Sequence, residues 1–406
     1  MKSFVVLVFS LVLFTDIIIA QEASQWRGKD RDGIYDEKGL LPSWPAEGPK
    51  LLWHYDNLGE GHASASVVAH EKIYTAGATD GKGTVFAFSL DGKLVWSTPY
   101  GDEWIESYPG SRSTPVINGG KVYLMSAFGK IVCLSADKGN ILWSVDIMKD
   151  YDGRNIVWGV TENLLIDGDK LFCTAGGVKN NVIALNKNTG KLIWSSAGNG
   201  EISAYCSPLL ITLPARKIVV TMTEKSILGL DAETGKKLWS YEQINQYAVH
   251  ANTPLYSNGY LYCVSGYGYG GVMLKLAADG SSVEKVWKNS RLDSRMGGVV
   301  LLNGKIYGLG DKVKGVFAID WKSGDEVAYE KLNGRSGTII SAEGLLYTYD
   351  ESGEVALIEP TLSGFKKISG FKVPFGSAQH WAHPVIENGR LYIRHGNSLM
   401  VYDIRK

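Results

Sequence analysis

The chain has 406 residues, of which 45% are hydrophobic and 21% are charged, so it can bury a large core. Lys plus Arg and Asp plus Glu both number 42, and this formal charge of zero argues against a nucleic-acid partner, which would leave a basic excess. The 48 Gly, 21 Tyr and 12 Trp residues are typical of short strands joined by tight turns.

Residues 1–20 are predicted to be a secretory signal peptide. Lys2 supplies a positive start, Phe4–Phe14 is an almost unbroken apolar run, and Ala20 suits cleavage. A membrane anchor is the alternative, but the unbroken run is short for a bilayer span. No Cys follows the run, so no lipid attachment site is predicted. We expect a periplasmic or secreted protein with no transmembrane span in the mature chain.

Residues 21–49 are predicted to be an irregular segment, because Gly and Pro recur throughout it. Its Asp30–Gly33 stretch resembles the start of a calcium loop. However, Ile34 and Leu41 would occupy two of the ligand positions, so the calcium pattern fails. We expect a polar surface loop here.

One pattern recurs over residues 50–406. A short apolar strand leads to a tight turn with Gly, and the next strand ends at Trp, as in Ala184–Trp194 (ALNKNTGKLIW) and Gly229–Trp239 (GLDAETGKKLW). The repeated aromatic residues are Trp53, Trp96, Trp143, Trp194, Trp239, Trp287 and then Tyr329. Their spacing of 42 to 51 residues fits four strands per blade of a β-propeller.

The repeat count predicts an all-β, eight-bladed propeller of four-stranded antiparallel blades. The last unit, Gln379–Lys406, lacks its outer strand, and Lys50–Tyr55 is a strand without a unit of its own. We therefore expect the N-terminal strand to close the ring, which removes an open edge. The seventh unit, Gly337–Val373, is the most degenerate, with Ile368 roughly where Trp should stand.

The repeated Trp residues have a structural explanation. A large ring on each outer strand can dock against glycine backbone of the neighbouring blade and bury much apolar area. At about 25 cal/mol per Å2, such burial contributes several kcal/mol before entropy. We predict that these residues stabilise the ring and bind no ligand.

Residues 25–406 resemble the PQQ-like (quinoprotein-type) eight-bladed propellers. The repeats quoted above carry the resemblance, and the opening Gln25–Gly28 and Trp44–Pro49 is similar to the head of exported bacterial members. The resemblance implies one of two kinds of protein. One kind is the dehydrogenases that bind PQQ and calcium over the funnel. The other is non-enzymatic scaffolds such as the propeller lipoprotein of the outer-membrane barrel-assembly machine.

The chain departs from both patterns. The large alcohol dehydrogenases carry two neighbouring Cys residues beside the cofactor, whereas this chain has no Cys-Cys and no clear calcium set of Glu, Asn and Asp. The lipidated Cys of the assembly lipoprotein is missing as well. The four cysteines are Cys133, Cys173, Cys206 and Cys263. Each lies in an apolar, strand-like run, so we expect buried free thiols rather than disulfides or a metal site.

A glycine pattern at Gly266–Gly271 matches G-x-G-x-x-G. A dinucleotide site needs a helix after this motif, but Val272–Leu276 is a strand sequence. We interpret the motif as a glycine-rich hairpin.

Aligning the units places a column of residues at the mouth of the central channel. The column contains His62, Ser111, Val160, Ala204, His250, Arg295, Arg335 and His380, with Arg112, Trp381 and His383 nearby. His and Arg residues dominate it, so it predicts a site for an anionic ligand, bound more tightly at pH 6 than at pH 8 as the histidines protonate. The alternative is that these groups hydrate a wet channel or pair with local carboxylates.

These observations predict an exported, non-catalytic scaffold that binds an envelope protein or a small anionic ligand at the channel mouth. No catalytic residue, metal ligand or cofactor is predicted, and we expect a monomer. The main alternative is a PQQ-dependent oxidoreductase using PQQ with calcium. A hydrolase or lyase built on the His cluster is a third, weaker hypothesis.

Overall fold

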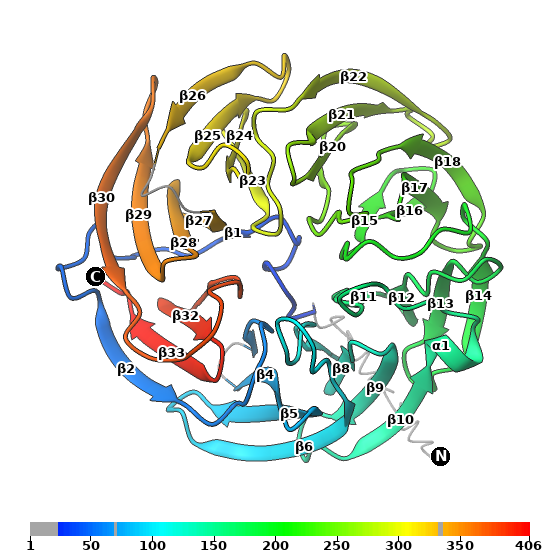
Figure 1. The fold of residues 1–406 in the computed structure, drawn as a ribbon, viewed down its shortest axis with the longest axis horizontal. Coiled ribbons are helices and arrows are strands. Elements are labelled where there is room, and N and C mark those ends of the chain that lie inside the picture. The colour runs from blue at the N-terminus through cyan, green and yellow to red at the C-terminus, as the bar shows by residue number, and fades with distance from the viewer. Residues whose placement is uncertain (1–22, 69–70, 332–335) are drawn as a thin grey trace, which may run out of the picture.

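The computed structural model describes residues 23–68, 71–331 and 336–406, so the predicted signal peptide at 1–20 lies outside the described residues. Eight four-stranded antiparallel sheets stand around a central axis, and the seventh sheet carries one additional strand (Figure 1). This confirms the predicted eight-bladed propeller. In the described part of the chain, no helix has the length and apolar character to cross a membrane.

The first four blades follow one another along the chain, each running from an inner to an outer strand. Blade one holds β3 (Ser66–Val68), β4 (Lys72–Thr79), β5 (Lys82–Ser89) and β6 (Leu94–Asp102). Blade two holds β7 (Val116–Asn118), β8 (Lys121–Met125), β9 (Lys130–Ser135) and β10 (Ile141–Asp146), followed by the one-turn helix α1 (Ile147–Asp150). Blade three holds β11 (Leu165–Asp167), β12 (Lys170–Cys173), β13 (Val182–Asn186) and β14 (Leu192–Ser196). Blade four holds β15 (Leu209–Thr212), β16 (Lys217–Met222), β17 (Ser226–Asp231) and β18 (Lys237–Glu242).

The remaining blades complete the circle. Blade five holds β19 (Leu255–Ser257), β20 (Tyr260–Ser265), β21 (Gly270–Leu276) and β22 (Val283–Asn289). Blade six holds β23 (Val299–Leu302), β24 (Lys305–Leu309), β25 (Val316–Asp320) and β26 (Glu326–Glu330). Blade seven holds β27 (Gly337–Ala342), β28 (Leu345–Asp350), β29 (Glu354–Pro360) and β30 (Phe365–Lys372), with β1 (Ile34–Tyr35) added to it in parallel. Blade eight holds β31 (Val385–Glu387), β32 (Arg390–His395), β33 (Ser398–Asp403) and β2 (Lys50–Tyr55).

The N-terminal strand closes the ring as predicted. β2 pairs antiparallel with the last strand, β33, placing Lys50 opposite Asp403 and Trp53 opposite Val401. The two ends of the chain thus share one sheet, and the missing outer strand of blade eight is supplied by sequence some 350 residues away.

Five of the repeated Trp rings lie against a glycine of the next blade. The pairs are Trp53 on Gly92, Trp96 on Gly139, Trp143 on Gly190, Trp194 on Gly235 and Trp287 on Gly324. Each of these five indole N–H groups also donates to a carbonyl of the same turn, at 3.0 to 3.3 Å. Each glycine has a positive φ, and a side chain there would collide with the ring.

Trp239 and Tyr329 depart from this arrangement. The Trp239 ring lies over Gly229 of its own blade, and its indole N–H has no hydrogen-bond partner in the described part of the chain. The next turn places Gly280 against Ile218 instead. Tyr329 donates to the Lys314 carbonyl in its own blade, at 3.1 Å. The docking contact is therefore lost between blades four and five.

The N-terminal segment does not form the polar surface loop that its composition predicts. It crosses the central opening of the ring before β1 joins blade seven (Figure 1). Trp26, Arg27 and Arg31 are 6%, 2% and 2% exposed, so these side chains before β1 are buried, whereas most of residues 36–47 are exposed. The surface prediction is wrong because the segment finds its partners on strands distant in sequence.

The two buried arginines bind main-chain carbonyls. Arg27 donates to Val299 O at 2.6 Å and to Ile339 O at 3.0 Å, on the inner strands of blades six and seven. Arg31 donates to Asn163 O and Pro208 O, both at 3.0 Å, and also to Leu164 O. Desolvation lowers the pKa of each guanidinium to about 10, so both stay charged at neutral pH. Multiple hydrogen bonds offset the cost of burying these charges.

Candidate functional site: the channel mouth

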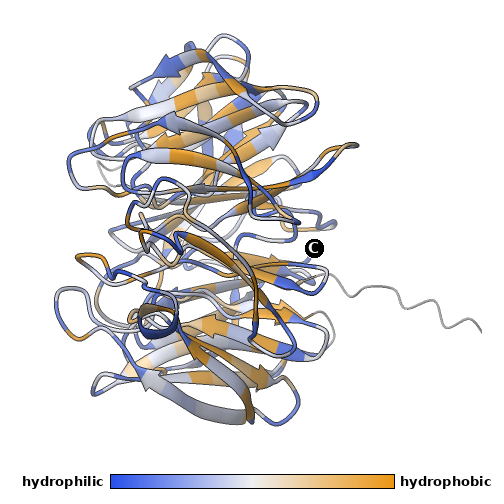
Figure 2. Cartoon of the chain, turned by 90° about the vertical axis from the view of Figure 1, so that its right-hand side faces the viewer, coloured by the Kyte–Doolittle hydropathy of each residue, from blue (hydrophilic) through white to orange (hydrophobic). Residues whose placement is uncertain are grey.

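One face of the propeller carries a cavity of about 490 Å3 around its axis. Loops from an outer strand to the next inner strand lie on this face, together with the loop between the second and third strands of each blade, because successive strands alternate in direction. The cavity is lined by these loops and by Trp26 of the N-terminal segment. Figure 2 shows the disc from the side, with loops extending beyond both ends of the strands.

Aromatic side chains form much of the cavity wall. Trp381 lies beside Tyr108, with ring centroids 4.7 Å apart, and Tyr247 lies edge-on to Tyr267 at the same separation. Trp158 and Tyr205 add a third aromatic pair at 6.2 Å. Rings of this size present flat apolar surface with few rotatable bonds, as recognition surfaces often do.

His383 and the N-terminal segment contact each other at this cavity. The His383 ring is 4.8 Å from the Trp26 ring, and its Nδ1 accepts from Arg27 at 3.2 Å. Its other nitrogen, Nε2, donates to Met296 O at 2.9 Å. Burial, reinforced by Arg27, lowers the pKa of His383 to about 3. This histidine is therefore neutral and holds the segment in place.

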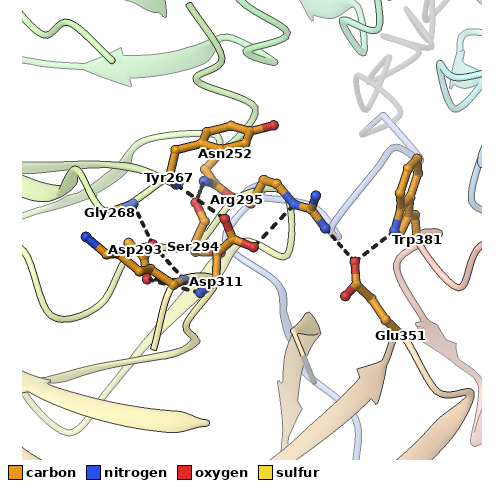
Figure 3. A network of polar contacts seen from close by, with 10 residues as sticks. Asn252, Tyr267, Gly268, Asp293, Ser294, Arg295, Asp311, Glu351 and Trp381 are labelled. Carbon is orange, nitrogen blue, oxygen red and sulfur yellow. Dashed lines mark hydrogen bonds and ion pairs between the residues drawn. The ribbon is translucent and has the colours of Figure 1, made fainter. Parts of the chain in front are cut away.

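Arg295 belongs to a network of charges (Figure 3). Its Nη2 lies 2.5 Å from Glu351 Oε1, and its Nε lies 3.6 Å from Asp311 Oδ1. Trp381 Nε1 donates to the same Glu351 oxygen at 3.1 Å. Next to the network, Asp293 accepts from the backbone N–H of Gly268 and Asp311. Two carboxylates thus neutralise Arg295. This supports the alternative that Arg295 pairs with local carboxylates and does not bind an external anion.

His62 and Arg112 have unsatisfied polar atoms at the cavity. Both ring nitrogens of His62 are buried without a hydrogen-bond partner in the described part of the chain, and so is Arg112 Nε. Arg112 Nη2 donates to the Tyr108 carbonyl at 2.7 Å, which fixes the guanidinium at the cavity wall. The His62 ring lies 5.0 Å from the Trp381 ring. Of the predicted site residues, the structure brings His62, Arg112, Arg295, Trp381 and His383 to one cavity.

His250 and His380 do not line this cavity, contrary to the predicted convergence. His250 is fully buried, with Nδ1 2.5 Å from Ser265 Oγ and Nε2 3.3 Å from Glu224 O. His380 Nδ1 lies 2.6 Å from the Tyr349 hydroxyl oxygen, and the His380 ring stacks on His395. The partners of His250 lie in blades four and five, and those of His380 lie in blades seven and eight, so each side chain is held between the two blades that its loop joins. Arg335 lies outside the described residues.

The predicted titration near neutrality is also wrong. Burial lowers the pKa of His62 to about 3 and that of His250 and His380 to about 4. These rings are neutral at both pH 6 and pH 8, so they add no positive charge over that range.

The sequence prediction missed the N-terminal contribution to this site. Trp26 lines the cavity and Arg27 supports His383, yet both lie in a segment that the sequence suggested was a surface loop. The one available signal was a Trp and two Arg residues within six positions of an otherwise Gly- and Pro-rich stretch. That signal does not show which surface the segment contacts.

The residues present do not match the donor set for a calcium-bound quinone. Calcium requires six to eight oxygen ligands, whereas the Asp311 and Glu351 carboxylates are engaged with Arg295. Across residues 23–68, 71–331 and 336–406, no group of three His, Cys, Asp or Glu side chains is placed to hold a metal ion. All four cysteines are buried free thiols.

A closed eight-bladed ring of Trp-docked repeats, with an aromatic mouth on its axis, defines the class of PQQ-like β-propellers. Within that class, the chain belongs to the family described as outer membrane protein assembly factor BamB. The family match covers residues 81–330, which is more than half of the chain.

Curated relatives come from both branches of the class. The quinoprotein ethanol dehydrogenase of Pseudomonas aeruginosa is 27% identical over 211 residues, covering 52% of this chain and 27% of the dehydrogenase. The assembly factor BamB of Kangiella koreensis is 24% identical over 225 residues, covering 53% of each chain. The chain thus matches only about half or less of the length of these relatives.

Solved structures show the same fold. BamB from Moraxella catarrhalis superposes with a TM-score of 0.64 at 18% identity, covering 87% of this chain and 99% of that one. A europium-containing methanol dehydrogenase superposes with a TM-score of 0.66 at 12% identity, covering 92% and 90%. At such identities the likeness establishes the fold alone.

Proposed function

We propose that this protein is an exported, non-catalytic scaffold that binds a partner protein of the cell envelope through its channel-mouth face. The observation that carries the proposal is the concentration of unpartnered apolar surface on that face. Ile105, Val157 and Tyr247, on three different mouth loops, are 67%, 72% and 50% exposed around the aromatic cavity. Clustered exposed apolar residues around a polar-lined pocket are typical of protein interaction sites.

Site-specific photo-crosslinking in intact cells tests this proposal. A photo-reactive amino acid replaces Val157 or Ile105 on the mouth face, and Leu362 is the matched control. Leu362 is 97% exposed on a loop between a third and a fourth strand, which lies on the opposite face. We expect adducts with one envelope protein from positions 157 and 105 and none from 362. Adducts from 362 alone, or no adducts at all, would contradict the proposal.

The second candidate is a PQQ-dependent oxidoreductase, favoured by the match to quinoprotein ethanol dehydrogenases. We propose that this chain works without PQQ and calcium, because the carboxylates at the mouth are held by Arg295. Titration with PQQ and calcium, followed by absorbance spectroscopy of the desalted protein, separates the two candidates. We expect no retained quinone, whereas stoichiometric uptake with a shifted quinone absorbance would establish the oxidoreductase.

A further inference from the structure

His62 lines the mouth cavity, and its ring carries one hydrogen-bond donor and one acceptor. Its ring is neutral, since burial beside Arg112 and Arg394 lowers its pKa to about 3, and a neutral imidazole has one N–H and one bare nitrogen. Both nitrogens are buried, and neither has a hydrogen-bond partner among residues 23–68, 71–331 and 336–406. A bare anion satisfies only the donor. A peptide offers acceptor oxygens and N–H donors together, so it complements both ring atoms.

Among the described residues that line the cavity, Arg112 is a cation without a carboxylate partner. Arg295 is bound by Glu351 and Asp311, whereas Arg112 makes no ion pair in the described part of the chain. The carboxyl of Glu103, which interacts electrostatically with Arg112, is instead hydrogen-bonded by the Tyr100 hydroxyl and the Ala127 N–H. Arg112 Nε is buried and has no hydrogen-bond partner in the described part of the chain, so the guanidinium keeps an unused donor at the cavity wall.

The aromatic side chains of the cavity wall indicate that apolar groups flank the negative charge of the ligand. Tyr108 and His62 both lie beside Trp381, with ring centroids 4.7 and 5.0 Å away, and Ile105, on the same loop as Tyr108, is 67% exposed. On another side, Tyr247 and Val157 extend the apolar surface outward. A bound segment therefore finds apolar contacts on both sides of the cavity, which suits an internal stretch better than a chain end.

On the basis of the proposed scaffold function, we infer that the mouth cavity binds an internal Asp or Glu of an extended partner segment, flanked by aromatic or aliphatic side chains. Arg112 and His62 bind the carboxylate, and the second His62 nitrogen accepts a main-chain N–H of the segment. Trp381 and Tyr108 contact the flanking apolar side chain. The occupant is thus an acidic-aromatic loop of an envelope protein.

Isothermal titration calorimetry with the full mature chain tests the inference. The probes are acetyl-Gly-Phe-Glu-Phe-Gly-amide and its isosteric Gln counterpart. Because a charge-assisted hydrogen bond is stronger than a neutral one, we expect the Glu peptide to bind about tenfold more tightly. Equal affinity of the two peptides, or no heat from the Glu peptide at millimolar concentration, would overturn the inference.

Variants assign the selectivity to named residues. Arg112→Gln should bring the Glu-to-Gln affinity ratio close to one, and His62→Phe should weaken both peptides while keeping a ring beside Trp381. Arg291→Gln is the control, because Arg291 pairs with Glu326 and does not line the cavity. Each variant is checked for an unchanged melting temperature. A ratio that survives Arg112→Gln in a folded protein contradicts the assignment.

A third peptide tests whether the bound carboxylate belongs to a side chain or to the C-terminus of the partner segment. Acetyl-Gly-Phe-Gly-Phe with a free C-terminus carries its charge at the chain end, and binding as tight as that of the Glu peptide would overturn the internal segment. The crosslinking result is separate from all of these outcomes. Adducts at position 157 without a preference for the Glu peptide would support the scaffold proposal and contradict the inferred binding of an acidic residue. A preference for the Glu peptide without adducts would support the acidic-residue site and contradict the scaffold proposal.

Discussion

The perimeter and the axis of this propeller are held together in different ways. On the perimeter, one contact recurs, with a Trp of one blade lying on a glycine of the next and donating to its turn carbonyl. On the axis, each contact occurs once, as when Arg27 joins the inner carbonyls of blades six and seven. The ring is therefore stabilised by a contact that repeats from blade to blade, whereas its centre is stabilised by the N-terminal segment, which occurs once.

Trp194 and Trp239 on the perimeter show that the docking contact depends on the surroundings of the Trp residue as well as on the residue itself. Trp194 and Trp239 are almost equally buried, at 8% and 7% exposed, and their repeat segments share five of eleven residues, including the Thr-Gly-Lys turn. Trp194 donates to Ala232 O at 3.1 Å, whereas the Trp239 N–H has no partner in the portion of the chain that the structure describes. The difference arises in the following blade, whose turn places its glycine elsewhere. The docking contact is therefore a property of two repeats together.

Truncation should give the largest effect, because it removes contacts on both the perimeter and the axis. Deleting residues 23–56 removes β2, Trp53 and both buried arginines, so we expect loss of the cooperative melting transition by calorimetry. A chain that begins at residue 50 keeps β2 and loses only the axial segment. It should melt cooperatively at a reduced temperature. An unchanged melting temperature for the longer deletion would show that strand closure is dispensable.

Substituting the two matched Trp residues tests the perimeter contact. Trp194→Ala should lower the free energy of unfolding by about 3–5 kcal/mol, as buried aromatic truncations do. Trp239→Ala should cost roughly 1 kcal/mol less, because no indole hydrogen bond is lost. Urea denaturation of the two variants gives the comparison. Equal losses would mean that the glycine docking contact contributes nothing beyond burial.

Removing one axial arginine should have a smaller effect. Arg31→Met leaves the carbonyls of Asn163 and Pro208 without their donor, so we expect a loss of about 1–3 kcal/mol in unfolding free energy. Arg405→Met is the control, since Arg405 is exposed and pairs with Asp403 on the perimeter. Denaturation curves that coincide for wild type and Arg31→Met would contradict the axial role.

A pH comparison gives the smallest expected effect. Burial raises the pKa of Glu162 to about 8, above its unfolded value of about 4.5. The folded state then holds a proton that the unfolded chain releases, so this stabilisation is present at low pH and is lost as pH rises towards 8. From pH 6 to pH 8, wild type should lose about 1–2 kcal/mol more than Glu162→Gln.

The control for the pH comparison lies on the perimeter. Arg405 holds the pKa of Asp403 down at about 2, so Asp403→Asn should leave the pH 6 to pH 8 difference unchanged. Unfolding free energies measured at both pH values test the two variants together. A pH dependence that survives in Glu162→Gln would place the titrating group elsewhere.

The sequence by itself determined the ring. The period of the Trp residues and the glycine turns fixed the eight blades, because each hairpin is encoded within a dozen neighbouring residues. The unpaired Lys50–Tyr55 strand and the truncated last unit also predicted closure, since each lacked the partner that the other supplies.

The arrangement of the channel mouth could not be predicted from the repeats. Whether His250 faces the cavity or Ser265 depends on side-chain rotation, which the strand period does not encode. Whether Arg295 is free depends on Glu351, 56 positions away, and the burial of Arg27 depends on Ile339, 312 positions away. These contacts form across blades rather than within a repeat. A local pattern cannot specify them, because they exist only after the ring has closed.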